Sequence, residues 1–304
     1  MNDKKMGYYF EPVGTCEMCG DSTEKHKILG QRLNTSQGLR PKKKSGISVS
    51  VKKCNNCQLV YSSPQPIPIN FQDHYGVPPE DYWIPEYFNW TPAYFADEVK
   101  KLNELMEIKK GMKSLDVGAG IGKCMLSMQS AGFDTYGFEP SETFHQMAIS
   151  KMNIPPEHLK LGMIEDMHYP ENSFDFITFG AVFEHLYHPS IALSKVLTWL
   201  KPGGIVHIEV PSSKYLVTKL YNIYYKLIGT NYVSNISPMY EPFHTYEFGY
   251  RSFQELGKRI GFKIVFHEYN VCSLTAFHKI FHPFLKRYMK WTDTGMQLIV
   301  WLSK

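Results

Sequence analysis

The sequence predicts an α/β fold built on a doubly wound sheet, and three observations support that prediction. The stretch SLDVGAGIGK, residues 114–123, is a short apolar strand followed by closely spaced glycines and the start of a helix. A second strand-like run, DTYGF, leads to Glu139 about 20 residues after the glycine turn. Farther on, FDFITFG and IVHIEV alternate as strands, and the turn LKPGG introduces the second of them. Strands separated by helical segments in this way indicate βαβ units.

The glycine turn after the first of these strands is typical of nucleotide binding. Gly118, Gly120 and Gly122 remove every Cβ where the backbone must turn tightly and let a ligand approach. The spacing is GxGxG, and Lys123 stands where a dinucleotide fold would continue toward its third glycine, which argues against a nicotinamide cofactor. Glu139 occupies the position at which doubly wound folds place an acid that accepts hydrogen bonds from ribose hydroxyls.

The order of these motifs, with IEDM before the turn YPENS and KPGG before the next strand, closely resembles the class I S-adenosylmethionine-dependent methyltransferases over residues 112–266. The resemblance implies a Rossmann-like sheet of seven strands with a reversed final hairpin. It also implies the residues that contact S-adenosylmethionine. These are Asp116, Gly118, Ala119 and Gly120 at the methionine part, Glu139 at the ribose, Asp166 and Met167 at the adenine, and Pro140 and Gly180 beside them. A capping role for Asp116 and a solvated position for Asp166 are the structural alternatives.

Two CxxC pairs near the start predict a metal site. Cys16, Cys19, Cys54 and Cys57 can place four thiolates tetrahedrally around Zn²⁺. Disulfides are the alternative, but no apolar segment of a secretory signal follows the polar residues 1–5, so we expect a reduced, cytoplasmic protein. Four cysteines close the coordination shell, which favours a structural zinc ion over a catalytic one.

The chain divides into three predicted parts. Residues 1–63 form a zinc-ribbon-like module, residues 64–111 an aromatic and proline-rich segment with a linker helix, and residues 112–304 the methyltransferase domain. The aromatic segment is either a lid over the cofactor or a strap between domains. An insertion at residues 212–243 is rich in tyrosine, and in the family that this chain resembles the acceptor usually lies beneath such an insertion; a packed helix is the alternative.

Two histidines are candidates for the general base that would remove a proton from an acceptor hydroxyl. His185 follows the fourth strand of the resemblance, and His244 follows the tyrosine-rich insertion, so both can face the acceptor cleft. Histidine titrates near neutral pH, as a base for this step should. The alternative is that His185 only shapes the pocket or binds the backbone.

The ribbon followed by LVYSSPQP is similar to the N-terminal module of bacterial sugar and natural-product methyltransferases, including nucleotide-sugar C-methyltransferases. Those have a further C-terminal domain for which this chain is too short, which favours O-methylation of a saccharide or a related small polar metabolite. One alternative is a zinc-knuckle RNA methyltransferase that contacts phosphate through Arg40–Lys44. Another is a non-catalytic cofactor-binding interaction module.

Composition narrows the class of partner. The 304 residues carry 33 basic and 29 acidic side chains, and a net charge of +4 argues against a nucleic-acid partner. No apolar run approaches the roughly 18 residues of a membrane helix, so we expect no membrane partner. The oligomeric state stays open.

Overall fold

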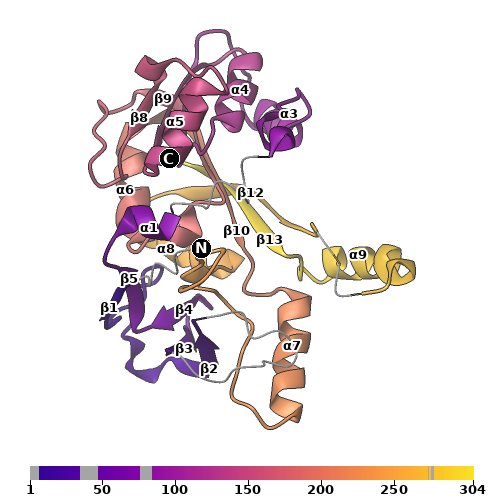
Figure 1. Ribbon diagram of the computed structural model, residues 1–304. Coiled ribbons are helices and arrows are strands. Elements are labelled where there is room, and N and C mark those ends of the chain that lie inside the picture. Colours follow the sequence, from indigo (N-terminus) through magenta and orange to yellow (C-terminus); the bar gives the residue numbers. More distant parts are fainter. Residues whose placement is uncertain (1–6, 35–46, 76–83, 273, 275–276) are drawn as a thin grey trace.

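The computed structural model describes residues 7–34, 47–75, 84–272, 274 and 277–304 (Figure 1). The basic segment Arg40–Lys44 lies outside the described residues. Among the described residues, no helix combines the length and the apolar character needed to cross a membrane.

The main sheet has seven strands in the order β12-β13-β10-β9-β6-β7-β8. Their bounds are β6 (Lys113–Val117), β7 (Asp134–Glu139), β8 (Leu159–Leu161), β9 (Phe174–Gly180), β10 (Leu200–Pro211), β12 (Lys263–Asn270) and β13 (Gln297–Ser303). Strands β10, β9, β6, β7 and β8 pair with one another in parallel, whereas β13 runs antiparallel to both of its neighbours, β10 and β12. The predicted Rossmann-like sheet with a reversed final hairpin is confirmed.

Helices cover both faces of this sheet. On one face, Leu102 of α3 (Ala96–Leu105) and Met128 of α4 (Lys123–Ser130) share a core with Phe176 and Trp301. On the other, α6 (Pro189–Trp199) and α8 (Tyr250–Ile260) pack their apolar side chains, and α5 (Glu142–Ser150) extends the first layer. The remaining helices in the described part of the chain are α1 (Phe71–Tyr75), α7 (Leu216–Leu227) and α9 (His282–Trp291), with 3-10 turns η1 (Thr23–Lys25), η2 (Pro85–Phe88), η3 (Pro156–His158), η4 (Phe183–His185) and η5 (Lys279–Phe281).

A second, smaller sheet carries the cysteine pairs. Its strands are β2 (Lys27–Leu33), β3 (Ser48–Lys53), β4 (Val60–Ser63) and β11 (Tyr246–Glu247), in the order β11-β4-β3-β2. Beside it, β1 (Tyr8–Glu11) pairs with β5 (Gln65–Pro68). Both pairings cross the predicted boundary at residue 63, because β5 belongs to the aromatic segment and β11 to the methyltransferase domain. The small sheet is therefore assembled from the first and the third predicted parts, and the β1-β5 pair joins the first part to the second.

The tyrosine-rich insertion lies along the edge of this small sheet (Figure 1). The backbone N–H of Gln31 donates to the carbonyl of Asn231 at 2.8 Å, and the N–H of Val233 donates back to Gln31 at 3.1 Å. A Cβ at Gly30 would stand 2.3 Å from the Asn231 carbonyl oxygen. The bare glycine backbone of β2 thus lets the insertion pair closely with the module.

Candidate functional site

A cavity of about 710 Å³ opens at the carboxyl ends of the central strands. Its lining includes Gly118 and Gly120 after β6, Glu139 at the end of β7, and Ala181 and Val182 after β9. Strand β6 lies between β9 and β7, so the chain crosses over in opposite directions on its two sides. Ligands of doubly wound sheets bind at such a switch point.

The glycine turn presents bare backbone to this cavity. Gly118 and Gly120 have φ angles of +67° and +56°, a region that favours glycine. A Cβ at Gly118 would lie 2.7 Å from Val182 Cγ2, whereas one at Gly120 would meet no protein atom within 4 Å. Gly120 therefore leaves open space beside the cavity, as a turn that cradles a ligand requires.

Two buried carboxyl groups lie under the turn. One oxygen of Glu139 accepts a hydrogen bond from the Gly120 N–H and the other from the Ser141 N–H, each at 2.8 Å. Burial raises the pKa of Glu139 to about 7. Asp116 is 3% exposed, its Oδ2 has no hydrogen-bond partner among the described residues, and burial together with the Glu139 charge raises its pKa to about 8. A cationic ligand in the cavity would favour ionisation of these two carboxyl groups, and the ionised groups would in turn attract the ligand.

The other residues predicted to contact the cofactor divide into two groups. Pro140 lines the cavity beside Glu139. The cavity lining does not include Asp116, Ala119, Asp166, Met167 or Gly180; Ala119 and Met167 are buried in the core, and Asp166 and Gly180 are exposed. Where Asp166 and Met167 were expected, the chain instead places Met163, Ile164 and Glu165 on the cavity. The residues after β8 that line the cavity thus come just before the predicted ones in the sequence.

The aromatic and proline-rich segment supplies one wall of the cavity. Phe71, His74 and Tyr87 line it. Gln72 donates from its side-chain amide to the Pro140 carbonyl at 2.9 Å, and Trp90 Nε1 donates to Ser127 Oγ at 2.9 Å. The segment is therefore tied to the methyltransferase domain on both sides of the wall that it builds.

The two candidate histidines meet at one end of the cavity. His185 lines it, and its ring centroid lies 5.2 Å from that of His244. His185 Nδ1 is 2.6 Å from the Phe243 carbonyl oxygen, to which it donates. Between the rings lies the carboxyl of Glu184, with Oε1 at 4.0 Å from His185 Nε2 and 3.7 Å from His244 Nε2. Burial lowers the pKa of His185 to about 4 and that of His244 to about 3, and raises that of Glu184 to about 8.

The tyrosines of the insertion are not part of this cavity. Among residues 212–243, only Glu241, Pro242 and Phe243 line it. This cavity therefore gives no support to the expectation that an acceptor lies beneath the tyrosine side chains, which stays a prediction. The insertion instead pairs with β2, where Tyr225 is buried and the Arg32 guanidinium donates to the Val233 carbonyl at 3.0 Å.

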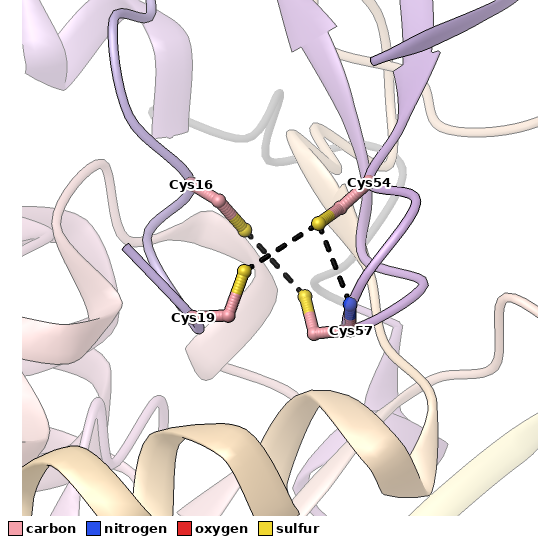
Figure 2. A group of neighbouring side chains, drawn as sticks. All are labelled: Cys16, Cys19, Cys54 and Cys57. Atoms are coloured by element: carbon pink, nitrogen blue, oxygen red, sulfur yellow. Dashed lines mark hydrogen bonds between the residues drawn. The ribbon is translucent and has the colours of Figure 1, made fainter. Parts of the chain in front are cut away.

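The four predicted metal ligands do converge (Figure 2). Cys16 Sγ lies 3.5 Å from Cys57 Sγ, and Cys19 Sγ lies 3.5 Å from Cys54 Sγ. These distances exceed the roughly 2.05 Å of a disulfide bond and approach the roughly 3.8 Å edge of a tetrahedron around zinc. All four thiols are free, and three of them are buried. The cluster can hold a metal ion.

Both cysteine pairs lie in the same kind of turn. The N–H of Gly20 donates to the Cys16 carbonyl at 2.8 Å, and the N–H of Gln58 donates to the Cys54 carbonyl at 3.1 Å. Gly20 and Gln58 both have positive φ. Each turn points its two thiols inward, which is what a shared ion requires.

The cluster packs against the methyltransferase domain. Ser252 of α8 donates from its hydroxyl to the Cys57 carbonyl at 3.0 Å, and Arg259 of the same helix donates to the Glu17 carbonyl at 2.8 Å. Ser190 at the start of α6 donates to the Glu17 carboxylate at 2.7 Å. Three of the cysteines belong to one continuous apolar core with strands of the main sheet.

Sequence reasoning missed two kinds of site residue. Tyr187 and Phe243 carry no motif of their own, although each lies within three residues of a histidine that was singled out. Glu184 was not predicted as a site residue, yet its carboxylate lies within 4.0 Å of both histidine rings. The density of aromatic residues in the segment before the glycine turn was the signal for Phe71 and Tyr87.

Comparison with known proteins agrees with this geometry. A family model described as a methyltransferase domain matches residues 87–267. The demethylmenaquinone methyltransferase of Staphylococcus aureus (strain MRSA252) is 30% identical over 136 residues, which are 42% of this chain and 56% of that protein. That of Staphylococcus carnosus (strain TM300) is 29% identical over 135 residues, with the same coverage. The chain thus spans little more than half the length of these relatives.

A solved structure shares the fold. A chain of the complex between the Haloferax volcanii Trm112 methyltransferase activator and a methyltransferase superposes with a TM-score of 0.50. The two are 15% identical, and the alignment covers 77% of this chain and 97% of that one.

Proposed function

This chain belongs to the methyltransferase domain family. From that premise we propose that it is an S-adenosylmethionine-dependent methyltransferase that methylates a hydroxyl oxygen of a small polar acceptor of the saccharide class. The observation that carries the proposal is the cluster of Glu184, His185 and His244 at one end of the cavity, where His185 is part of the lining. A hydroxyl acceptor needs a group there that removes its proton.

The proposed cofactor contacts follow from the cavity lining. The backbone of Gly118 and Gly120 holds the methionine part, Glu139 accepts from the ribose hydroxyls, and Pro140 lies beside it. The buried carboxyl of Asp116 supports the positive charge from beneath the turn. At the adenine we propose Met163, Ile164 and Glu165, because Asp166 is exposed and Met167 is packed in the core.

The cofactor supplies a methyl group already activated on a sulfonium, so the protein has to position and deprotonate the acceptor. His185 and His244 are the proposed bases. Burial lowers the pKa of both imidazoles, which keeps them neutral and able to accept a proton near pH 7 but makes them weaker bases than the histidine expected from the sequence. As the new bond to the acceptor oxygen forms, the bond from the methyl carbon to sulfur breaks and its electron pair stays on sulfur. The proton goes to the imidazole.

We further propose that Cys16, Cys19, Cys54 and Cys57 hold one structural Zn²⁺. The buried, inward-facing thiols support it, and four sulfur ligands leave no open position for chemistry.

A second candidate acceptor comes from the relatives, whose name states that they act on demethylmenaquinone. The screen that separates the candidates is methyl transfer from labelled S-adenosylmethionine to nucleotide sugars, glycans, demethylmenaquinone and RNA. We expect label in a saccharide fraction. Label confined to demethylmenaquinone or RNA would overturn the saccharide proposal, and no transfer to any fraction would favour a non-catalytic binding module.

A further inference from the structure

Glu184, His185 and His244 are held together by the backbone. Glu184 and His185 lie on η4, directly after β9, and His244 lies just before β11. Thr245 donates both its N–H and its hydroxyl to the Glu184 carbonyl, at 3.1 and 2.8 Å. Two segments about 60 residues apart in the chain are thereby fixed side by side.

The distances among their polar atoms suit a shared ion better than direct hydrogen bonds. One ligand atom from each residue can be chosen so that all lie within 4.8 Å of one another. The Glu184 carboxylate is 3.7 and 4.0 Å from the two Nε2 atoms, too far for a hydrogen bond. Metal bonds of about 2.0–2.2 Å hold neighbouring ligand atoms on the order of 3 to 4 Å apart.

One oxygen of the Glu184 carboxyl group is buried without a hydrogen bond from the described part of the chain. The Glu184 side chain is 2% exposed, and its Oε2 has no hydrogen-bond partner among the described residues. An unpaired carboxylate is costly to bury unless a cation or several hydrogen bonds offset the loss of hydration. No lysine or arginine of the described residues forms an ion pair with it. A bound cation would supply the missing charge.

The environment of His185 is that of a metal ligand. Its Nδ1 donates to the Phe243 carbonyl at 2.6 Å, and its Nε2 is the ring nitrogen nearer Glu184. Ligating histidines typically donate their other ring N–H to a backbone carbonyl or a carboxylate. The hydrogen bond to Phe243 fixes the direction of the ring.

We propose that Glu184, His185 and His244 bind one divalent first-row transition-metal ion at the acceptor end of the cavity. Two imidazoles and one carboxylate suit ions such as Zn²⁺, Co²⁺, Mn²⁺ or Fe²⁺ rather than Mg²⁺ or Ca²⁺, which prefer oxygen ligands. Three protein ligands leave positions open, and His185 faces the cavity.

Such an ion deepens the proposed function, on which this step rests. An acceptor hydroxyl at an open position loses its proton to solvent more readily, because the cation stabilises the oxyanion. The oxygen lone pair then takes the methyl group, and the electron pair of the broken bond stays on sulfur. The ion would replace free imidazole as the activating group, while metal binding itself does not depend on which acceptor is used.

The test is calorimetric titration of the full chain, with its cysteine site already loaded with zinc, using Co²⁺ and Zn²⁺ in turn. We expect one further ion per chain and a Co²⁺ spectrum without thiolate charge-transfer bands. Glu184→Gln and His244→Asn should each weaken binding at least about 100-fold, since even outer-shell partners of a ligand are worth 10- to 100-fold. His188→Asn is the matched control, because His188 is exposed and pairs with Glu17 instead.

S-adenosylmethionine affinity, measured on each variant, shows that the fold is retained. Failure of both ions to bind the parent chain, or unchanged affinity in both folded variants, would overturn the metal site. Methyl transfer found in the acceptor screen without metal binding would leave the proposed function standing with histidine as the base. Metal binding without methyl transfer to any acceptor would support the metal site and contradict the proposed function.

Discussion

Thr245 donates two hydrogen bonds to one atom, the carbonyl oxygen of Glu184, through its backbone N–H and its hydroxyl. The contact joins the turn after β9 to the strand that completes the small sheet. It also sets the distance between His185 and His244, which the chain order alone leaves free.

We therefore expect Thr245→Val to disturb the cluster without removing any of its members. Loss of one buried hydrogen bond should cost about 1 kcal/mol of stability, and turnover should fall because the two histidines lose part of what fixes their separation. Thr245→Ser keeps the hydroxyl and is the control. Thermal unfolding and kcat measured side by side would contradict the assigned role if the valine and serine variants behaved alike.

Gly120 provides the sharpest test of the cofactor site. Gly120→Val should abolish S-adenosylmethionine binding, because the new side chain meets no protein atom and extends into the open space beside the cavity. Gly203→Val imposes similar strain at φ +78°, at an exposed position of β10 where the strand register is irregular, and should bind normally. Calorimetry on both variants decides, and equal affinities would refute the assignment.

Removal of one cysteine of the cluster should change the stability of the protein more than its affinity for the cofactor. Cys54→Ser should remove one zinc ion per chain and lower the unfolding temperature by something like 10 °C, because metal binding contributes directly to folding. Cofactor affinity should change less. Cys272→Ser is the control, since Cys272 is exposed and remote from the cluster. Metal analysis that found no zinc in the parent protein, purified without chelator, would rule out the site.

Cofactor affinity should depend on pH through Glu139. Burial raises the pKa of this carboxyl to about 7, so it is largely protonated at pH 6 and ionised at pH 8. Only the ionised form accepts from both ribose hydroxyls and attracts the sulfonium, so affinity should rise about 10-fold across that range. The same shift means that this group favours the folded, ligand-free protein at low pH and loses that contribution as pH rises toward 7. Glu139→Gln should flatten both profiles, and a parent-like pH slope in that variant would assign the titration elsewhere.

Substitution of the two histidines tests how the acceptor is activated. His185→Ala should lower kcat about 10² to 10⁴-fold with nearly unchanged cofactor affinity, whether the imidazole acts as base or as ligand. His244→Ala tests the second candidate in the same way, and His188→Ala should be neutral. Near-full turnover in both variants at saturating acceptor would indicate an acceptor that needs no deprotonation.

The sequence predicted what depends on local geometry. The glycine turn, Glu139 and the two cysteine knuckles each follow from a few neighbouring residues, and the structure places the four thiols together and Glu139 on the cavity. The adenine contacts stay a prediction: Asp166 does not line the cavity, and the sequence position of a single acid does not determine the direction of its side chain. The conformation of the turn after β8 determines the direction of the Asp166 side chain.

The sequence did not predict the pairings between segments that are far apart in the chain. Nothing in the tyrosine spacing of the insertion shows that Asn231 and Val233 pair with Gln31. The short strand β11 has only two residues, too few for any periodicity, and its partner β4 lies about 180 residues earlier. The meeting of His185 with His244 was expected from their order after the strands, but the role of Glu184 between them was not.

The shared small sheet sets a limit on how this protein can be recombined. A transplant of residues 1–63 onto another enzyme would leave β4 with an uncovered edge where Tyr246 and Glu247 now pair, and edges of that kind invite aggregation. The β2 edge would likewise lose its contacts with Asn231 and Val233. Any exchange of the zinc-ribbon-like module must therefore carry residues 231–247 with it, and these include His244. Replacement of the module would therefore also replace a residue at the proposed acceptor end of the cavity.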